Sequence, residues 1–185
     1  MLFTGKGDTG TTKVFDTASG KRISKNSLLS EALGSLDEVN SFLGLCKVES
    51  GKNAFNVSGK SCADIVHGTQ ENLFIIQAEL AGAEKTIPEE KLREAERLIN
   101  AIEKELPPIA TFFISGGAEL AARFDVARTL ARRAERRVVG VVEAGERRMG
   151  EWSLAYLNRL SSLLYALARL SNRKSDIVEQ SPRYE

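Results

Sequence analysis

The sequence predicts an all-α protein, an antiparallel five-helix bundle that follows an irregular amino-terminal loop. Apolar residues recur every three or four positions in five long segments, no segment alternates as a strand would, and the connections are short. A chain of 185 residues suits one domain, residues 1–185. We divide it into a loop segment at 1–25, the helical bundle at 26–172 and a polar tail at 173–185.

The first two helices are separated by a glycine-bounded loop at residues 51–59. The first helix has an apolar stripe at Leu29, Leu33, Leu36, Val39 and Leu43. The second, at about residues 63–81, has its stripe at Val66, Thr69, Leu73, Ile76 and Leu80. Both spacings are typical of amphipathic helices with one buried face.

The remaining three helices have clear boundaries. Pro88 suits the first position of the third helix, and Pro107 follows its end. A short apolar stretch at 109–114 then leads to Gly116 and Gly117. We expect the fourth helix at about 118–143 and the fifth at about 152–172. The polar residues from Lys174 onward are expected to fray.

Composition excludes several functions. A net charge of +1 argues against a protein that binds nucleic acid through bulk positive charge. Cys46 and Cys62 lack CxxC spacing, and the single histidine, His67, suits an exposed helix surface. No apolar run is long enough for a membrane span and no signal peptide is present, so we expect a cytoplasmic protein that does not associate with membranes.

The amino-terminal loop, residues 4–12, has the composition of an anion site. It holds three glycines, four threonines and Lys6. Glycines let successive N–H groups converge on one point, and hydroxyls and the ammonium add further donors. It is not a Walker loop, because Thr11 and Thr12 stand where Lys-Ser/Thr is required. Asp8 would repel a phosphate unless Mg²⁺ lay between them. A flexible tail remains the alternative.

The fourth helix is rich in arginine. Arg128, Arg132 and Arg136, the arginine edge, follow one flank of its apolar stripe, with Glu135 within reach. Arg133 and Arg137 fall on the opposite flank. The crowded edge favours a polyphosphate clamp in which Glu135 orients an arginine. A solvated face whose charges pair with acids elsewhere is the alternative.

Other polar and aromatic residues border apolar faces. Asn158 is either satisfied by neighbouring backbone or available to a ligand. Three acids on the first helix could pair with the arginines: Glu31, Asp37 and Glu38. Phe112, beside a glycine turn, is either core filler or the wall of an apolar pocket.

In combination these segments resemble the PduO-type ATP:cob(I)alamin adenosyltransferases. The resemblance covers residues 4 to about 169 and rests on the amino-terminal loop, Lys25 with residues 31–38, 112–117, 126–139 and 156–161. It implies a homotrimer with active sites between subunits. Across the subunit boundary the resemblance pairs Asp37 with Arg128, and it places Phe112 over the lower face of the corrin.

The same resemblance assigns ATP contacts to both regions of the chain, and the chemistry of the amino-terminal loop adds Asp8, Gly10 and Thr11. The expected ATP-binding residues are Thr4, Gly5, Lys6, Gly7, Asp8, Gly10, Thr11, Thr12, Lys13, Lys25, Arg132, Glu135, Arg136 and Asn158. The residues expected to act in catalysis are Lys25, Phe112, Arg132, Glu135 and Arg136.

The implied reaction transfers the 5′-deoxyadenosyl group of ATP to cob(I)alamin, giving adenosylcobalamin and triphosphate. ATP, Mg²⁺ and cobalamin are therefore the expected ligands, with a reductase and an adenosylcobalamin-dependent enzyme as partners. Two alternatives stay open. One is a non-catalytic ATP- or corrinoid-binding sensor or delivery module, and the other is a helical assembly protein that uses Arg128 and Asp37 as an interface pair.

Overall fold

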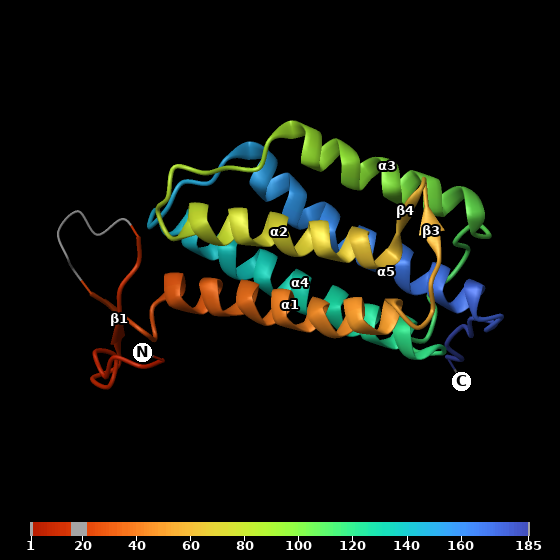
Figure 1. Cartoon of the computed structure of the whole chain (residues 1–185), viewed down its shortest axis with the longest axis horizontal. Coiled ribbons are helices and arrows are strands. Elements are labelled where there is room, and N and C mark those ends of the chain that lie inside the picture. Colours follow the sequence, from red (N-terminus) through yellow and green to blue (C-terminus); the bar gives the residue numbers. More distant parts are fainter. Residues whose placement is uncertain (1, 16–21, 185) are drawn as a thin grey trace.

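Five helices form the body of the protein in a computed structural model, which describes residues 2–15 and 22–184 (Figure 1). Their bounds are α1 Leu28–Ser50, α2 Cys62–Leu80, α3 Glu89–Glu105, α4 Glu119–Glu143 and α5 Glu151–Lys174. Two short hairpins accompany them, one pairing β1 (Thr11–Thr12) with β2 (Ile23–Ser24) and the other β3 (Asn56–Val57) with β4 (Lys60–Ser61). The prediction of a helical fold is confirmed.

Local chemistry explains where helices begin. The Ser27 hydroxyl accepts a hydrogen bond from Ser30 N at 3.2 Å, and the Ser61 hydroxyl accepts one from Asp64 N at 3.1 Å. Each bond satisfies an amide that the first helical turn leaves unpaired. Pro88 is extended and precedes α3, so the helix starts one residue later than we expected.

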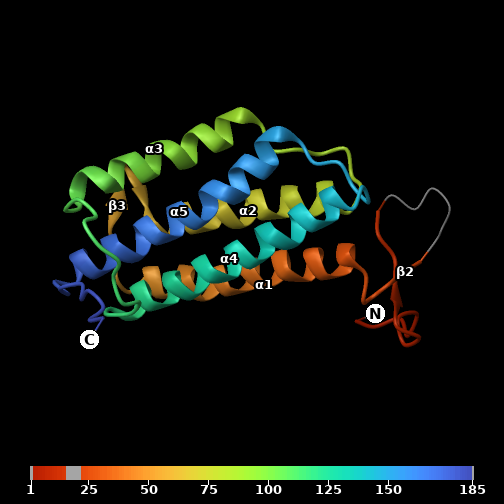
Figure 2. The ribbon, with the colours of Figure 1, turned by 180° about the vertical axis from the view of Figure 1, so that it is seen from behind.

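The helices pack against one another in the order α2, α1, α4, α5, α3. Helix α4 contacts α1 and α5, α2 lies against α1, and α3 lies against α5, an arrangement visible from both sides (Figures 1 and 2). Ion pairs join Glu38 to Arg133 and Glu31 to Arg137, so α1 and α4 run in opposite directions. The core between the helices is apolar, with Phe124, Leu157 and Leu160 among its fully buried side chains.

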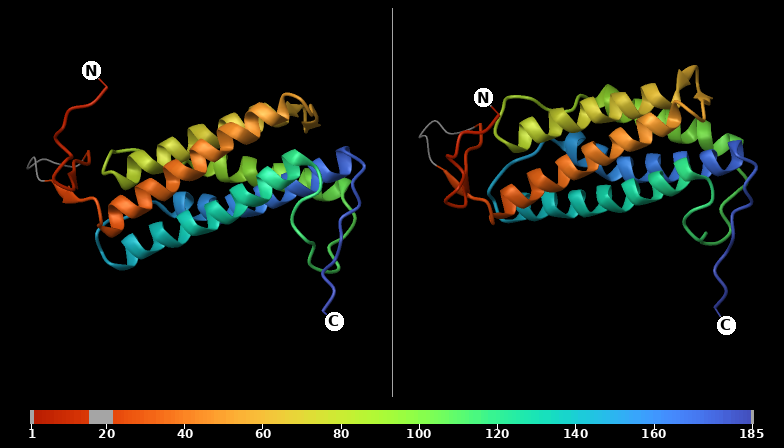
Figure 3. Two further views of the ribbon diagram at one scale, coloured as in Figure 1. Left: turned by 90° about the horizontal axis from the view of Figure 1, so that it is seen from below. Right: turned by 60° about the horizontal axis from the view of Figure 1, so that its bottom comes forward.

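The two ends of the bundle carry different polypeptide segments (Figure 3). The amino-terminal residues lie at the end where α1 begins. The connection between α3 and α4, residues 106–118, lies at the opposite end beside the carboxyl-terminal tail. This separation determines which parts of a site one chain can assemble alone.

Three local expectations were wrong. Part of the amino-terminal segment is not irregular, because β1 and β2 pair, and β3 lies in the stretch we expected to be a plain loop. The tail does not fray at Lys174: Ile114 N donates to Gln180 O at 2.8 Å, and Arg169 pairs with Glu179 at 3.0 Å. Long-range partners, which a sequence pattern does not reveal, order the amino-terminal segment and the tail.

The structure confirms that the histidine lies on a helix surface, and it buries both cysteines. Cys46 and Cys62 are free and buried, and burial raises the pKa of each thiol to about 12. His67 is exposed on α2, with Nε2 3.7 Å from Glu71 Oε1. Within residues 2–15 and 22–184, no helix is long and apolar enough to cross a membrane.

Candidate functional site

The amino-terminal loop is compact and lies against Lys25. Gly5 and Gly10 have positive φ angles of 66° and 76°, which glycine adopts without strain. The backbone N–H of Lys25 donates to Gly10 O at 2.9 Å. A Cβ built on Gly7 would lie 3.1 Å from Lys25 Nζ, so a lysine eighteen residues away in the sequence reaches the glycine turn. The structure thus brings Lys25 next to the amino-terminal loop, as the expected phosphate site requires.

Most other predicted side chains of the loop are exposed. Thr4, Lys6, Asp8 and Lys13 face solvent, and Thr4 Oγ1 accepts a 3.4 Å hydrogen bond from Lys6 N. The remaining hydroxyl-bearing members lie in or beside β1, where Thr12 is paired with Ile23. Among the described residues no group of three or more Asp, Glu, His or Cys side chains could hold a metal. Asp8 therefore belongs to no such group.

Sequence reasoning missed Arg22, which organises the loop. Its Nε donates to Thr11 Oγ1 and its Nη2 to Thr11 O, each at 2.7 Å. A guanidinium has no acceptor, so the Thr11 oxygen must accept here, and its hydroxyl hydrogen stays available to another acceptor. Thr9 Oγ1, 3.5 Å away, is the neighbouring hydroxyl. No spacing rule links positions 11 and 22, because a β pairing brings them together.

The arginines of α4 divide into paired and unpaired groups. Arg133 and Arg137 form ion pairs with Glu38 and Glu31 of α1, respectively, so the charges on this flank of α4 are paired. Within the described part of the chain, Arg132 and Arg136 have no carboxylate partner; Arg136 Nη1 donates to Arg132 O at 3.1 Å. Two exposed guanidiniums without counter-charge are chemically suited to bind an anion, and we call this pair the candidate anion site.

Arg128, the first residue of the arginine edge, has partners within its own chain. Its Nε lies 3.4 Å from Asp125 Oδ1, and its guanidinium lies 5.9 Å from the centre of the Tyr165 ring. Asp37, its expected partner, is exposed on α1 and has no ion-pair partner among the residues described. Among the described residues, Asp37 and Arg128 are thus not paired with each other.

Glu135 and Asn158 connect α4 to α5 at the arginine edge. Asn158 Nδ2 donates to Glu135 Oε1 at 2.9 Å, and Arg159 Nη1 donates to Asn158 Oδ1 at 2.8 Å. Our expectation that Glu135 orients an arginine was wrong for this chain, because its partner is the amide of Asn158. The spacing on α4 permitted an arginine contact, but the packing of α5 supplied a closer donor.

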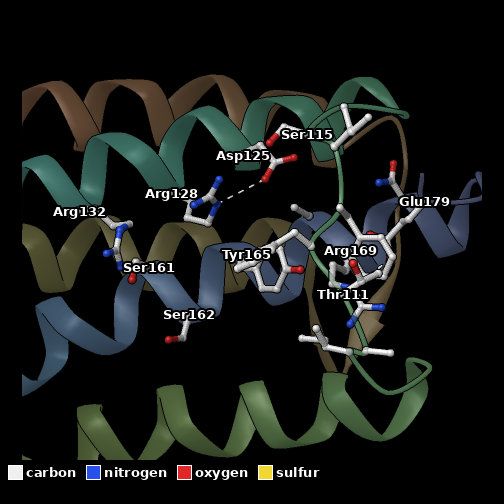
Figure 4. Close-up of a pocket in the computed structure, with 17 residues that line it drawn as sticks. Thr111, Ser115, Asp125, Arg128, Arg132, Ser161, Ser162, Tyr165, Arg169 and Glu179 are labelled. Carbon is white, nitrogen blue, oxygen red and sulfur yellow. Dashed lines mark hydrogen bonds and ion pairs between the residues drawn. The ribbon is translucent and has the colours of Figure 1, made fainter. Parts of the chain in front are cut away.

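A cavity of about 570 Å³ lies beside the arginine edge, between α4, α5 and the connection that carries Phe112 (Figure 4). Phe112 lines it and is 78% exposed, so it is not core filler. Arg128 and Arg132 border the cavity from α4, and Ser161, Ser162 and Tyr165 border it from α5. Arg132 therefore belongs both to the candidate anion site and to a large, partly apolar cavity.

Four further residues that sequence reasoning did not assign hold the cavity wall in place. Asn172 accepts from Ala118 N at 2.9 Å and donates to Gly116 O at 3.0 Å, and Asp125 accepts from Gly116 N at 3.2 Å. Arg169 and Glu179 contribute an ion pair. The polar residues near the end of α5 were a usable signal, because a core-facing asparagine or arginine requires partners.

The fold, the unpaired arginines and the cavity define a helical-bundle protein that can place a polyanion against a large co-substrate. Residues 2–171 match the family model described as cobalamin adenosyltransferase, and the chain belongs to this family. The chain is 37% identical to a corrinoid adenosyltransferase of Bacillus subtilis, with 95% of this chain and 89% of that protein covered.

Other relatives are longer than this chain. It is 36% identical to the corrinoid adenosyltransferase PduO of Salmonella typhimurium, an alignment that covers 99% of this chain and 54% of that protein. The PduO relative of Citrobacter freundii is 38% identical, with 91% and 49% covered. The chain thus spans about half the length of these two relatives.

Solved structures share the whole fold. One is a variant of the PduO-type ATP:corrinoid adenosyltransferase of Lactobacillus reuteri, complexed with cobalamin and ATP. It is 27% identical to this chain and has a TM-score of 0.86, and the match covers 99% of each chain. A second variant, complexed with ATP, is 28% identical with a TM-score of 0.84, covering 98% of this chain and 100% of that one.

Proposed function

We propose that the protein is an ATP:cob(I)alamin adenosyltransferase. The observation that carries the proposal is the position of Arg132, which joins the candidate anion site to a cavity large enough to admit part of a bulky co-substrate. Related structures hold ATP alone or ATP with cobalamin, which matches these two features. We assign the activity to one adenosyltransferase domain that comprises residues 1–185.

In the proposed reaction the cobalt of cob(I)alamin, a substrate, attacks C5′ of ATP with its electron pair. The cobalt–carbon bond forms as the C5′–oxygen bond breaks, and triphosphate leaves with the bonding electrons. Cobalt(I) is itself a strong nucleophile, so no side-chain base is needed. The protein must align C5′ with cobalt and stabilise the charge on triphosphate.

The residues of the chain divide between these two tasks. Lys6, Lys25, Arg132, Arg136 and the loop amides would stabilise the departing triphosphate. Mg²⁺ carried by ATP near Asp8 would neutralise part of its charge. Glu135 and Asn158, already joined to each other, would bind the nucleoside end. Phe112 would exclude a lower ligand from the corrin and make reduction to cobalt(I) easier.

The proposal includes a homotrimer with active sites between subunits. It is supported by the separation, at opposite ends of one chain, of the amino-terminal loop and the connection between α3 and α4 (Figure 3), a connection that lines the cavity. A neighbouring copy would bring its loop to the arginine edge, and Asp37 would reach Arg128 of that neighbour. Opposite courses of α1 and α4 support antiparallel packing within each subunit. We place the enzyme in the cytoplasm, supplied by a reductase and serving an adenosylcobalamin-dependent enzyme.

A direct assay tests the activity. The protein is mixed anaerobically with ATP, Mg²⁺ and chemically reduced cobalamin while the spectrum and free triphosphate are followed. We expect the spectrum of adenosylcobalamin and one triphosphate per corrinoid, with neither in the absence of ATP. ATP binding without triphosphate release would instead identify a sensor or delivery module, and an unchanged melting temperature with ATP and Mg²⁺ would favour an assembly protein.

A further inference from the structure

Arg169 is a buried charge at the end of the cavity farthest from Arg132 (Figure 4). Its side chain is 4% exposed, its Nε lies 3.0 Å from Glu179 Oε2, and its Nη2 donates to Pro107 O at 3.3 Å. The guanidinium also lies 4.8 Å from the centre of the Phe113 ring. Burial of a guanidinium is tolerated only with such partners, so Arg169 ties three parts of the chain to one point.

Those three parts are the end of α5, the tail and the cavity segment, residues 107–118. The tail adds a backbone bond from Ile114 N to Gln180 O at 2.8 Å. In the sequence, Phe112 lies between Pro107, which Arg169 contacts, and Phe113 and Ile114, which Arg169 and the tail contact. Its side chain is exposed, so the backbone around it determines where the ring lies.

We propose that Arg169 and Glu179 are positioning residues, and that residues 175–180 act as a strap holding the cavity segment so that Phe112 faces the corrinoid. This inference rests on the proposed function for the identity of the ligand. Arg169 and Glu179 touch neither substrate. They act through the backbone of the cavity segment, and the tail thereby becomes part of the cobalamin-side wall.

A second ion pair at the same end of the bundle provides the matched control. Lys174 Nζ lies 2.7 Å from Glu105 Oε2, and both side chains are exposed. This pair joins α5 to α3 and does not involve the cavity segment. A variant at Glu105 removes one carboxylate, as a variant at Glu179 does, without loosening the strap.

The test compares Glu179→Gln with Glu105→Gln, each as the full chain. Hydrogen exchange is measured on peptides that cover residues 109–117, and KM is measured separately for cob(I)alamin and for ATP. In Glu179→Gln we expect faster exchange in that peptide and a KM for cob(I)alamin raised about tenfold, below the roughly hundredfold cost of a 1 Å misplacement. The KM for ATP should stay at the wild-type value, and Glu179→Asp should restore part of the cobalamin affinity.

The outcomes test the strap and the proposed function separately. An active wild-type protein with unchanged exchange in Glu179→Gln, or with faster exchange but an unchanged KM for cob(I)alamin, overturns the strap. An equal rise in both KM values also overturns it, because a general loss of structure would act on both substrates. An inactive wild-type chain would refute the proposed function, while the exchange comparison would still test whether Glu179 holds the segment.

Discussion

Asn158 on α5 donates a 2.9 Å hydrogen bond to Glu135 on α4, beside two arginines that have no carboxylate partner among the described residues. This bond gives Glu135 an amide as its partner in place of an arginine, and Arg132 and Arg136 stay open to an external anion. It also joins the two helices that border the proposed ATP site. The first two predictions follow from this arrangement.

Arg132→Ala should lower turnover without unfolding the protein. Loss of one preorganised donor to a departing anion typically costs about 100-fold or more in kcat. Arg133→Ala is the matched control: it lies one residue further on α4, pairs with Glu38, and should change turnover little and unfolding free energy by about 0–1 kcal/mol. Triphosphate release and thermal melting measure both effects. Equal losses of turnover in the two variants would contradict the clamp.

Glu135→Gln and Asn158→Ala should be non-additive. The two side chains form one hydrogen-bonded unit, so either substitution alone already breaks the hydrogen bond, and adding the other should have little further effect. We expect each single variant to raise the KM for ATP and the double variant to resemble the worse single one. A double-mutant cycle on ATP affinity provides the measurement. Strictly additive losses would mean that the two residues act on the nucleotide independently.

Asp37→Asn should weaken the proposed trimer. Asp37 is exposed and unpaired within the described chain, whereas its neighbour Glu38 already binds Arg133. We expect Asp37→Asn to shift the assembly toward smaller species at micromolar concentration and to lower activity with it. Light scattering after gel filtration measures the change, with Glu38→Gln as the control. A wild-type protein that is monomeric at active concentrations would refute the shared site.

Gly150→Ala should destabilise the fold, and Gly140→Ala should not. A Cβ on Gly150 would lie 2.4 Å from Thr86 Oγ1 and 3.3 Å from Glu79 Oε1, and the Gly150 N–H donates to that carboxylate at 2.6 Å. We expect a loss of about 1–3 kcal/mol in unfolding free energy. Gly140, inside α4, has open space around its Cβ direction, and alanine there should add about 0.5–1 kcal/mol. Denaturant titrations of both variants test the pair.

The two buried thiols should make stability fall at high pH. Burial raises the pKa of Cys46 and Cys62 from 9.0 to about 12. Because the folded-state pKa is the higher one, the stabilising effect of the neutral thiols is complete below about pH 9 and is lost as the pH rises toward 12. Native protein at pH 8 should react slowly with a thiol reagent and quickly once unfolded. Fast labelling of the native protein would show that the thiols are accessible.

Much of the site was visible in the sequence because neighbours on one helix are fixed by its geometry. A rotation of 100° per residue places two pairs of arginines on opposite flanks of α4, Arg132 with Arg136 and Arg133 with Arg137. The ion pairs that Arg133 and Arg137 form with α1 agree with this placement. The glycine-rich loop was likewise indicated by local composition, whereas for Phe112 the sequence left both core filler and a cavity wall open. These features depend on residues close together in the chain, which a pattern records directly.

The sequence by itself determined the five helices, the chemistry of the amino-terminal loop and the flank on which each arginine lies. Only the tertiary structure decided that Glu135 binds Asn158, that Arg22 holds Thr11, and that the tail returns to Arg169. The physical reason is that periodicity fixes directions within one element. Contacts between distant segments depend on how whole helices pack. They also depend on which polar groups become buried and therefore need a hydrogen-bond partner.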